Sequence, residues 1–226
     1  MAILPSDLLQ RLTKDEAAAL IRAIDAIGEE LAIVYATNVA DHREARGDNS
    51  QLFGLKVWVH GRHRATLRFE EDDVVRVVDA NGSYSILVPP LSIGVYKLGD
   101  SVHDDVRACF PDKSPTKRAY GERNRAQLTL FDPEMTSPLP REATYGLNEL
   151  IVGHHGNPRD GLVKWYVGAY VIDSAGHPEW AWIERQDMPA EASQPARLRP
   201  PIIPFDGRDA EPLEVRPRRD STGSGE

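Results

Sequence analysis

The chain has 226 residues, of which 41% are hydrophobic and 27% are charged, and its formal net charge at pH 7 is −8. This is the composition of an ordinary globular protein, and the acidic excess disfavours general binding to nucleic acid, because phosphate contacts need a basic surface. The single cysteine, Cys109, excludes an internal disulfide and a zinc knuckle.

The first long helix is predicted over about residues 14–39. Thr13 and Glu16 fit a capping box, in which each side chain bonds the backbone N–H of the other residue. The apolar residues that follow recur every three or four positions, at Leu20, Ile24, Ile27, Leu31 and Val34. We expect this stripe to pack on a sheet; the alternative is the seam of a dimer.

Strands are predicted next, over about residues 55–98. Apolar and polar residues alternate over 55–60, Gly61 and Arg62 suit a tight turn, and 65–70 reads as a returning strand. Asn81-Gly82 between two apolar runs indicates a hairpin, and Pro89-Pro90 ends its second strand. With a last strand over 93–98, the pattern predicts an antiparallel meander of about five strands without a helical crossover.

Residues 99–143 show little periodicity, but 112–127 carries a basic cluster around Tyr120. We expect a solvated loop, with contact to phosphate groups or to an acidic partner as the alternative. The basic residues concerned are Lys113, Lys117, Arg118, Arg123 and Arg125.

A second block of strands is predicted over 150–185, and it is rich in large aromatic residues. Alternation along 162–172 places Trp165 on one face of a strand and Tyr166 and Tyr170 on the other. Either both faces are covered, or one forms an exposed patch that binds a partner. The predicted partner-binding residues are Trp165, Tyr166, Tyr170, Trp180 and Trp182.

The stretch GHHGNPRDG, residues 153–161, joins two of these strands and is rich in turn-forming residues. His154 and His155 then end a strand and point to opposite faces. The alternative is a zinc or manganese site in which His60 and His63 join His154 or His155, with Glu149 or Asp160 as general base. No other cofactor is expected.

Common catalytic motifs are missing from the chain. The sequence contains no GxSxG, GxxxxGK[ST], GxGxxG or HExxH pattern. We expect Cys109 to be a small buried residue rather than a nucleophile. The N-terminus lacks the features of a signal peptide and no window approaches the ~20 apolar residues of a membrane span, so a cytoplasmic protein without membrane contact is expected.

The chain is therefore predicted to be an α+β protein with one domain over 1–188 and a disordered, proline-rich tail over 189–226, in which 198–205 is apolar enough to dock. The favoured function is a non-enzymatic regulatory protein that binds another protein or itself, such as an antitoxin, an immunity protein or an accessory factor. The alternatives are a metal-dependent hydrolase or nuclease and a nucleic-acid-associated accessory protein.

Overall fold

The predicted N-terminal helix is α2, Lys14–Asp41, and it begins at the expected capping box. The Thr13 hydroxyl accepts a hydrogen bond from the backbone N–H of Glu16, whose carboxylate accepts one from the backbone N–H of Thr13 at 2.8 Å. The apolar stripe of α2 is buried against the sheet, which confirms packing on a sheet rather than a dimer seam. Gly28 lies on this side, where a Cβ atom would come within 2.6 Å of the Trp165 ring.

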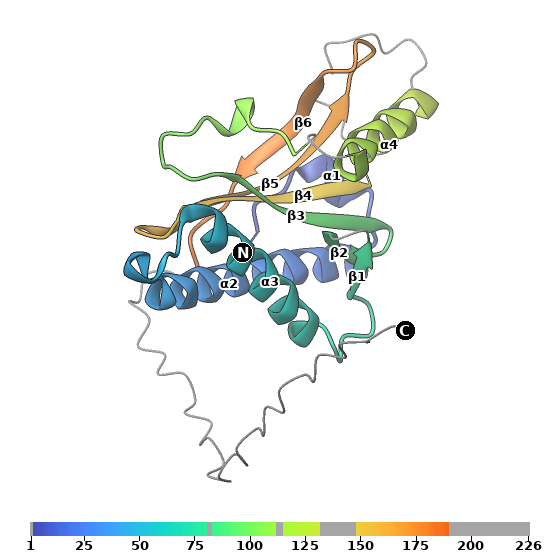
Figure 1. The fold of residues 1–226 in the computed structure, drawn as a ribbon. Coiled ribbons are helices and arrows are strands. Elements are labelled where there is room, and N and C mark those ends of the chain that lie inside the picture. The colour runs from blue at the N-terminus through green and yellow to red at the C-terminus, as the bar shows by residue number, and fades with distance from the viewer. Residues whose placement is uncertain (1, 81–82, 112–114, 132–147, 190–226) are drawn as a thin grey trace, which may run out of the picture. The chain divides into compact units, whose positions relative to one another are not determined.

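The computed structural model describes residues 2–80, 83–111, 115–131 and 148–189, which belong to one compact unit, Met1–Ala196. Its centre is a six-stranded sheet in the order β1-β2-β3-β4-β5-β6 (Figure 1). All neighbouring strands are antiparallel except β3 and β4, which are parallel. The strands are β1 Arg76–Ala80, β2 Ser83–Val88, β3 Leu91–Gly99, β4 Glu149–Asn157, β5 Gly161–Ile172 and β6 Pro178–Arg185.

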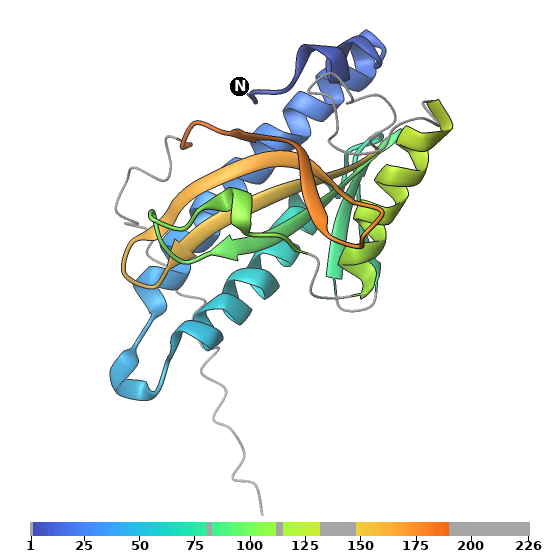
Figure 2. The same ribbon diagram turned by 90° about the horizontal axis from the view of Figure 1, so that it is seen from above.

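Helices cover both faces of this sheet, as Figures 1 and 2 show. On one face α2 and α3, Ser50–Arg68, pack over the larger apolar cluster. On the other face α4, Pro115–Phe131, packs over β4 and β5 and closes a smaller cluster that contains Tyr120, Ile151 and Tyr170. The α+β class, with a long N-terminal helix on a mostly antiparallel sheet, is therefore confirmed.

The prediction of two strands over 55–70 is wrong, because these residues belong to α3. The side chain of Asn49 caps this helix by accepting a hydrogen bond from the backbone N–H of Leu52 at 2.9 Å. Six alternating residues are too few to distinguish the two-residue repeat of a strand from the 3.6-residue repeat of a helix. Over the longer window the buried positions recur every four residues, as a helix requires: Phe53, Val57, Gly61 and Ala65.

The last three strands of the predicted meander are confirmed as β1, β2 and β3, each antiparallel to its neighbour. After β3 the chain crosses over through α4, although no helical crossover was predicted. The basic segment expected as a loop is largely this helix, with Pro115 as its first residue, the position at which proline is best tolerated in a helix. The parallel pairing of β3 with β4 follows from this crossover. The hairpin around Asn81-Gly82 is confirmed by the pairing of Ala80 with Ser83, although the two turn residues lie outside the described ones.

The remaining elements are short: α1 Ser6–Gln10, η1 Glu44–Arg46 and η2 Val106–Ala108. Gln186, after β6, holds the N-terminal segment by accepting from the backbone N–H of Ile3 at 2.7 Å and donating to its carbonyl at 2.9 Å. None of the helices in the described part of the chain has the length and apolar character needed to cross a membrane. The tail prediction, with its segment 198–205, lies outside the described residues apart from Pro189.

Candidate functional site

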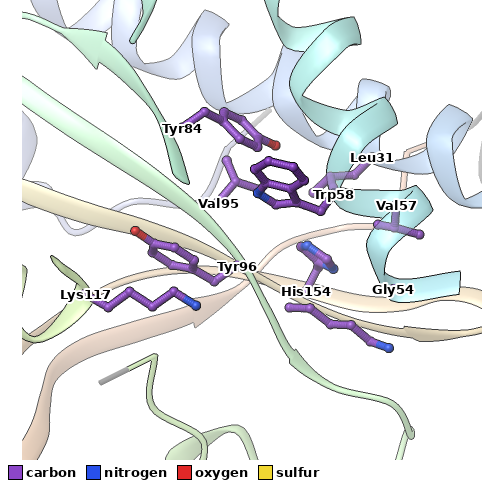
Figure 3. Close-up of a pocket in the computed structure, with 10 residues that line it drawn as sticks. Leu31, Gly54, Val57, Trp58, Tyr84, Val95, Tyr96, Lys117 and His154 are labelled. Carbon is purple, nitrogen blue, oxygen red and sulfur yellow. The ribbon is translucent and has the colours of Figure 1, made fainter. Parts of the chain in front are cut away.

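A pocket with a volume of about 230 Å³ lies between α3 and the second half of β3 (Figure 3). The pairing of β2 with β3 ends at Ser85 and Gly94, whereas β3 continues beside β4 as far as Gly99. Among the described strands, none pairs with β3 on its β2 side beyond Gly94, and α3 passes this open edge. The pocket is lined by Leu31, Gly54, Val57, Trp58, Tyr84, Val95, Tyr96, Lys97, Lys117 and His154.

Three aromatic side chains from three different elements are among the residues that line the pocket. Trp58 comes from α3 and is half-buried, whereas Tyr84 at the start of β2 and Tyr96 of β3 are buried. Gly54 adds space, because apart from its chain neighbours and the nearby backbone of α3 no atom lies within 4 Å of the position that a Cβ atom would take there. The wall therefore offers flat apolar surfaces of the kind that bind planar organic molecules.

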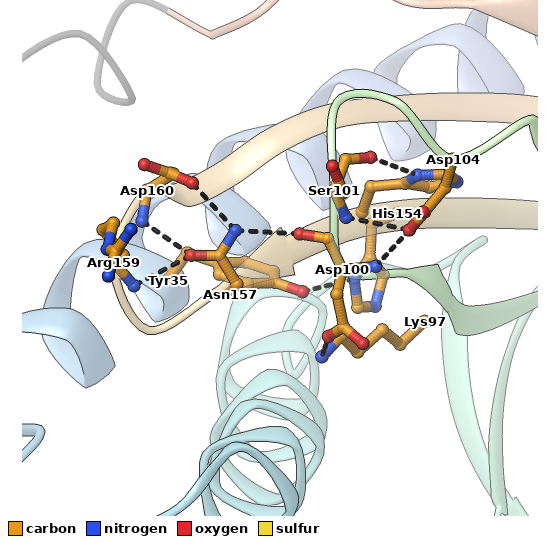
Figure 4. A network of polar contacts seen from close by, with 10 residues as sticks. Tyr35, Lys97, Asp100, Ser101, Asp104, His154, Asn157, Arg159 and Asp160 are labelled. Carbon is orange, nitrogen blue, oxygen red and sulfur yellow. Dashed lines mark hydrogen bonds and ion pairs between the residues drawn. The ribbon is translucent and has the colours of Figure 1, made fainter. Parts of the chain in front are cut away.

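A buried hydrogen bond between Tyr35 and His154 lies next to the pocket (Figure 4). The Tyr35 hydroxyl on α2 is 2.8 Å from Nδ1 of His154 on β4, and the two rings meet edge to face. Burial raises the pKa of Tyr35. Burial, helped by the charge of Lys97, lowers the pKa of His154 to about 3, so its imidazole is neutral at physiological pH.

Two lysines bring positive charge to the pocket. Lys97 is the register neighbour of His154 on the adjacent strand, and its ammonium group bonds the carboxylate of Asp100. Lys117 of α4 places its ammonium 4.6 Å from the centroid of the Tyr96 ring. Burial lowers the pKa of Lys117. Aromatic surface and positive charge are therefore combined in a single pocket.

The structure does not bring the four histidines of the predicted metal site together. His154 faces Tyr35, whereas Nδ1 of His155 on the other face is 3.2 Å from the carbonyl of Ser101, as expected for adjacent residues of a strand. His60 and His63 are exposed on α3. Within the described ranges, no group of three or more histidine, cysteine or carboxylate side chains is placed to hold a metal ion.

The turn interpretation of GHHGNPRDG is confirmed. The strands end at Asn157 and resume at Gly161, whose φ of +70° suits glycine. The side-chain oxygen of Asn157 accepts hydrogen bonds from the backbone N–H groups of Arg159 and Asp160, both at 2.8 Å (Figure 4). Asp160 is therefore a turn residue, and the other proposed base, Glu149, forms an ion pair with Arg123.

The aromatic residues predicted to bind a partner do not form a surface patch, so that prediction is corrected. The sheet places β5 between β4 and β6, with α2 over one face and α4 over the other. Of the two alternatives left open by the sequence, coverage of both faces of this strand is therefore confirmed, and the exposed patch is wrong. The buried residues are Trp165, Tyr166, Tyr170 and Trp182, while Trp180 is partly buried and stacks on Phe110.

The predicted basic cluster mostly ties α4 to the sheet. Arg118 donates to the carbonyl of Gly176 at 2.9 Å, and Arg125 donates to the carbonyl of Ile172 at 3.1 Å. Arg123 pairs with Glu149, Lys117 lines the pocket, and Lys113 lies outside the described residues. Contact of these side chains with phosphate stays a prediction, and it would require several of them to leave their present partners.

Sequence reasoning missed most of the pocket. Trp58 was assigned to a strand. Tyr84 and Tyr96 fit the pattern of their predicted strands and carry no further signal of a binding site. His154 was singled out, but for a metal rather than for its contact with Tyr35. No model of a protein family, no curated protein and no solved structure matches this chain.

Proposed function

We propose that this chain is a binding protein that takes a small organic molecule with a flat apolar part into the pocket between α3 and β3. The observation that carries the proposal is the convergence of Trp58, Tyr84 and Tyr96 around one cavity. Aromatic rings bury a large area and stack on planar groups, so a cavity of this kind favours such a ligand.

The chemistry of the pocket favours binding over acid–base catalysis. A general base works best when its pKa lies near the operating pH. The pKa of His154, at about 3, lies far below neutrality, and the pKa of Tyr35 lies above its ordinary value. At neutral pH both side chains therefore keep fixed protonation states, which suits the recognition of a ligand.

Calorimetric titration with naphthalene-2-carboxamide, a small planar probe, tests this proposal. In Gly54→Leu a side chain enters the cavity without a close contact at its Cβ position, so we expect a stable fold and at least a tenfold loss of affinity. Gln51→Leu adds the same side chain at an exposed position of α3 and should bind like the wild type. Absence of saturable binding to the wild type, or equal binding to both variants, would overturn the proposal.

A second candidate is the protein–protein role predicted from the sequence, now placed on α3 rather than on the buried aromatic residues. Leu52, Leu55 and Val59 lie on the outer side of this helix and are 36%, 56% and 45% exposed. Their spacing of three and four residues forms one stripe. Such a stripe is the apolar face that a helix uses for association.

We propose a second copy of this chain as the occupant of this stripe. The basic side chains of α3 pair with carboxylates of their own chain, including Lys56 with Asp48 and Arg64 with Glu30, so the positive charge beside the stripe is locally offset. Sedimentation should show self-association that weakens in Leu55→Ser and persists in Val78→Ser, a control at an exposed valine of β1. A wild type that stays monomeric at a protein concentration of about 100 µM, where a weak dimer would form, would refute this candidate.

A further inference from the structure

We infer that the ligand of this pocket is an anion of the carboxylate class, and that one of its oxygens accepts a hydrogen bond from the Nε2–H group of His154. The inference rests on the proposed small-molecule function and adds to it the chemical class of the ligand and a residue that determines specificity.

The contact with Tyr35 fixes which nitrogen of His154 carries the proton. The Tyr35 side chain is fully buried, and among the described residues Nδ1 of His154 is the one hydrogen-bond partner of its hydroxyl. If Nδ1 carried the proton, the Tyr35 hydroxyl would be left without an acceptor, and a buried unpaired donor costs about 1–3 kcal/mol. The hydroxyl therefore donates to Nδ1, and the ring proton is on Nε2.

The second ring nitrogen is directed toward the pocket. Nδ1 and Nε2 point to opposite sides of an imidazole, so Nε2 faces away from Tyr35. His154 lines the cavity, where Figure 3 draws it together with Trp58 and Val57. Because Nδ1 is occupied by Tyr35, Nε2 is the ring nitrogen of His154 that is left for a ligand in this cavity.

The remaining nitrogen groups of the pocket are also donors. Lys97 and Lys117 offer ammonium groups and Trp58 offers an indole N–H, and none of these groups can accept a hydrogen bond. Asp100 offsets part of the charge of Lys97, and the ammonium group of Lys117 lies over the Tyr96 ring. A carboxylate only accepts, so it matches these donors in charge and in hydrogen bonding. A carboxamide of the same shape also carries N–H donors, which the nitrogen groups of the pocket cannot accept.

The test compares naphthalene-2-carboxylate with naphthalene-2-carboxamide by calorimetric titration. We expect the wild type to bind the carboxylate at least tenfold more tightly, and His154→Leu to lose most of that preference while binding the carboxamide unchanged. Lys117→Gln should weaken the carboxylate selectively. If both probes bind equally, or if the preference survives His154→Leu, this inference fails while the proposed function stands. If neither probe binds the wild type, the proposed function itself fails.

A second measurement keeps the inference testable if His154→Leu does not fold. Nitrogen-15 NMR of histidine-labelled wild type reports the tautomer of each ring without any ligand. We expect the proton of His154 on Nε2 at pH 7, and this state should persist when naphthalene-2-carboxylate is added. A proton on Nδ1 would remove the donor that faces the pocket and overturn the inference.

Discussion

The hydroxyl of Tyr35 lies 2.8 Å from Nδ1 of His154, and both side chains are almost completely buried, at 0% and 4% exposure. This contact joins α2 to β4 beside the candidate ligand pocket. It holds a histidine in its neutral form inside the protein, and that state has a measurable consequence for stability because the unfolded chain protonates the same side chain freely.

Stability should fall as the pH is lowered from 7.5 to 5. Burial, and then the charge of Lys97, lowers the pKa of His154 to about 3 from its ordinary value of 6.5, so between these values the unfolded chain binds a proton that the folded chain does not. Between pH 7.5 and 5 the free energy of unfolding should decrease by an amount on the order of a few kcal/mol. Burial lowers the pKa of His155 as well, which adds to the same trend.

Urea unfolding at several pH values checks this prediction, with His154→Gln as the matched variant. Glutamine can accept a hydrogen bond from Tyr35 but does not titrate, so the dependence of unfolding free energy on pH should become clearly shallower. The interval above pH 5 largely avoids the titration of the carboxylates, whose ordinary pKa values lie near 4. Equal slopes for the two proteins would show that His154 is not the group responsible.

Gly28→Ala should destabilise the protein although alanine favours helices. A Cβ atom at this position would lie 2.6 Å from the Trp165 ring, and relieving that overlap should cost more than the ~1 kcal/mol that alanine gains in a helix. We expect a net loss of about 1–2 kcal/mol in urea unfolding. Combining it with Trp165→Phe should recover part of the loss, and additive effects would contradict the proposed contact.

Gly54→Ala should have the opposite effect. Apart from its chain neighbours and the nearby backbone of α3, no atom lies within 4 Å of the Cβ position at Gly54, so the same substitution meets no packed neighbour there. The gain in helix propensity should stabilise the protein by up to ~1 kcal/mol. Thermal or urea unfolding measures it, and a destabilisation at Gly54 similar to that at Gly28 would show that helix position rather than packing decides both results.

The parts of the fold that were predictable from sequence are those set by local chemistry. The capping box of Thr13 and Glu16 located the start of α2, and Asn157 and Gly161 identified the turn between β4 and β5. Each signal depends on hydrogen bonds or backbone angles within a few residues. The opposite orientation of His154 and His155 likewise follows from the geometry of a single strand.

The parts that were not predictable depend on contacts between distant segments. The alternating residues of α3 fit a strand over six positions, and the four-residue spacing that identifies the helix becomes clear once packing on α2 shows which positions are buried. The helix α4 is recognised by what it contacts, through Tyr120 and Asn124, rather than by a strong apolar stripe. The pocket was missed for the same reason, because Trp58, Tyr84 and Tyr96 meet only after these elements assemble.

Asn124→Leu should destabilise the protein strongly, because this fully buried amide joins α4 to two strands. Its side-chain N–H groups donate to the carbonyls of Glu149 and Tyr170, both at 2.9 Å, and its oxygen accepts from the backbone N–H of Glu149 at 3.0 Å. Leucine leaves these backbone groups unpaired, at an expected cost of about 2–4 kcal/mol in urea unfolding. Glu122→Gln, on the exposed side of α4, should change stability by less than ~1 kcal/mol. Similar small effects for both variants would mean that α4 is held mainly by its apolar contacts.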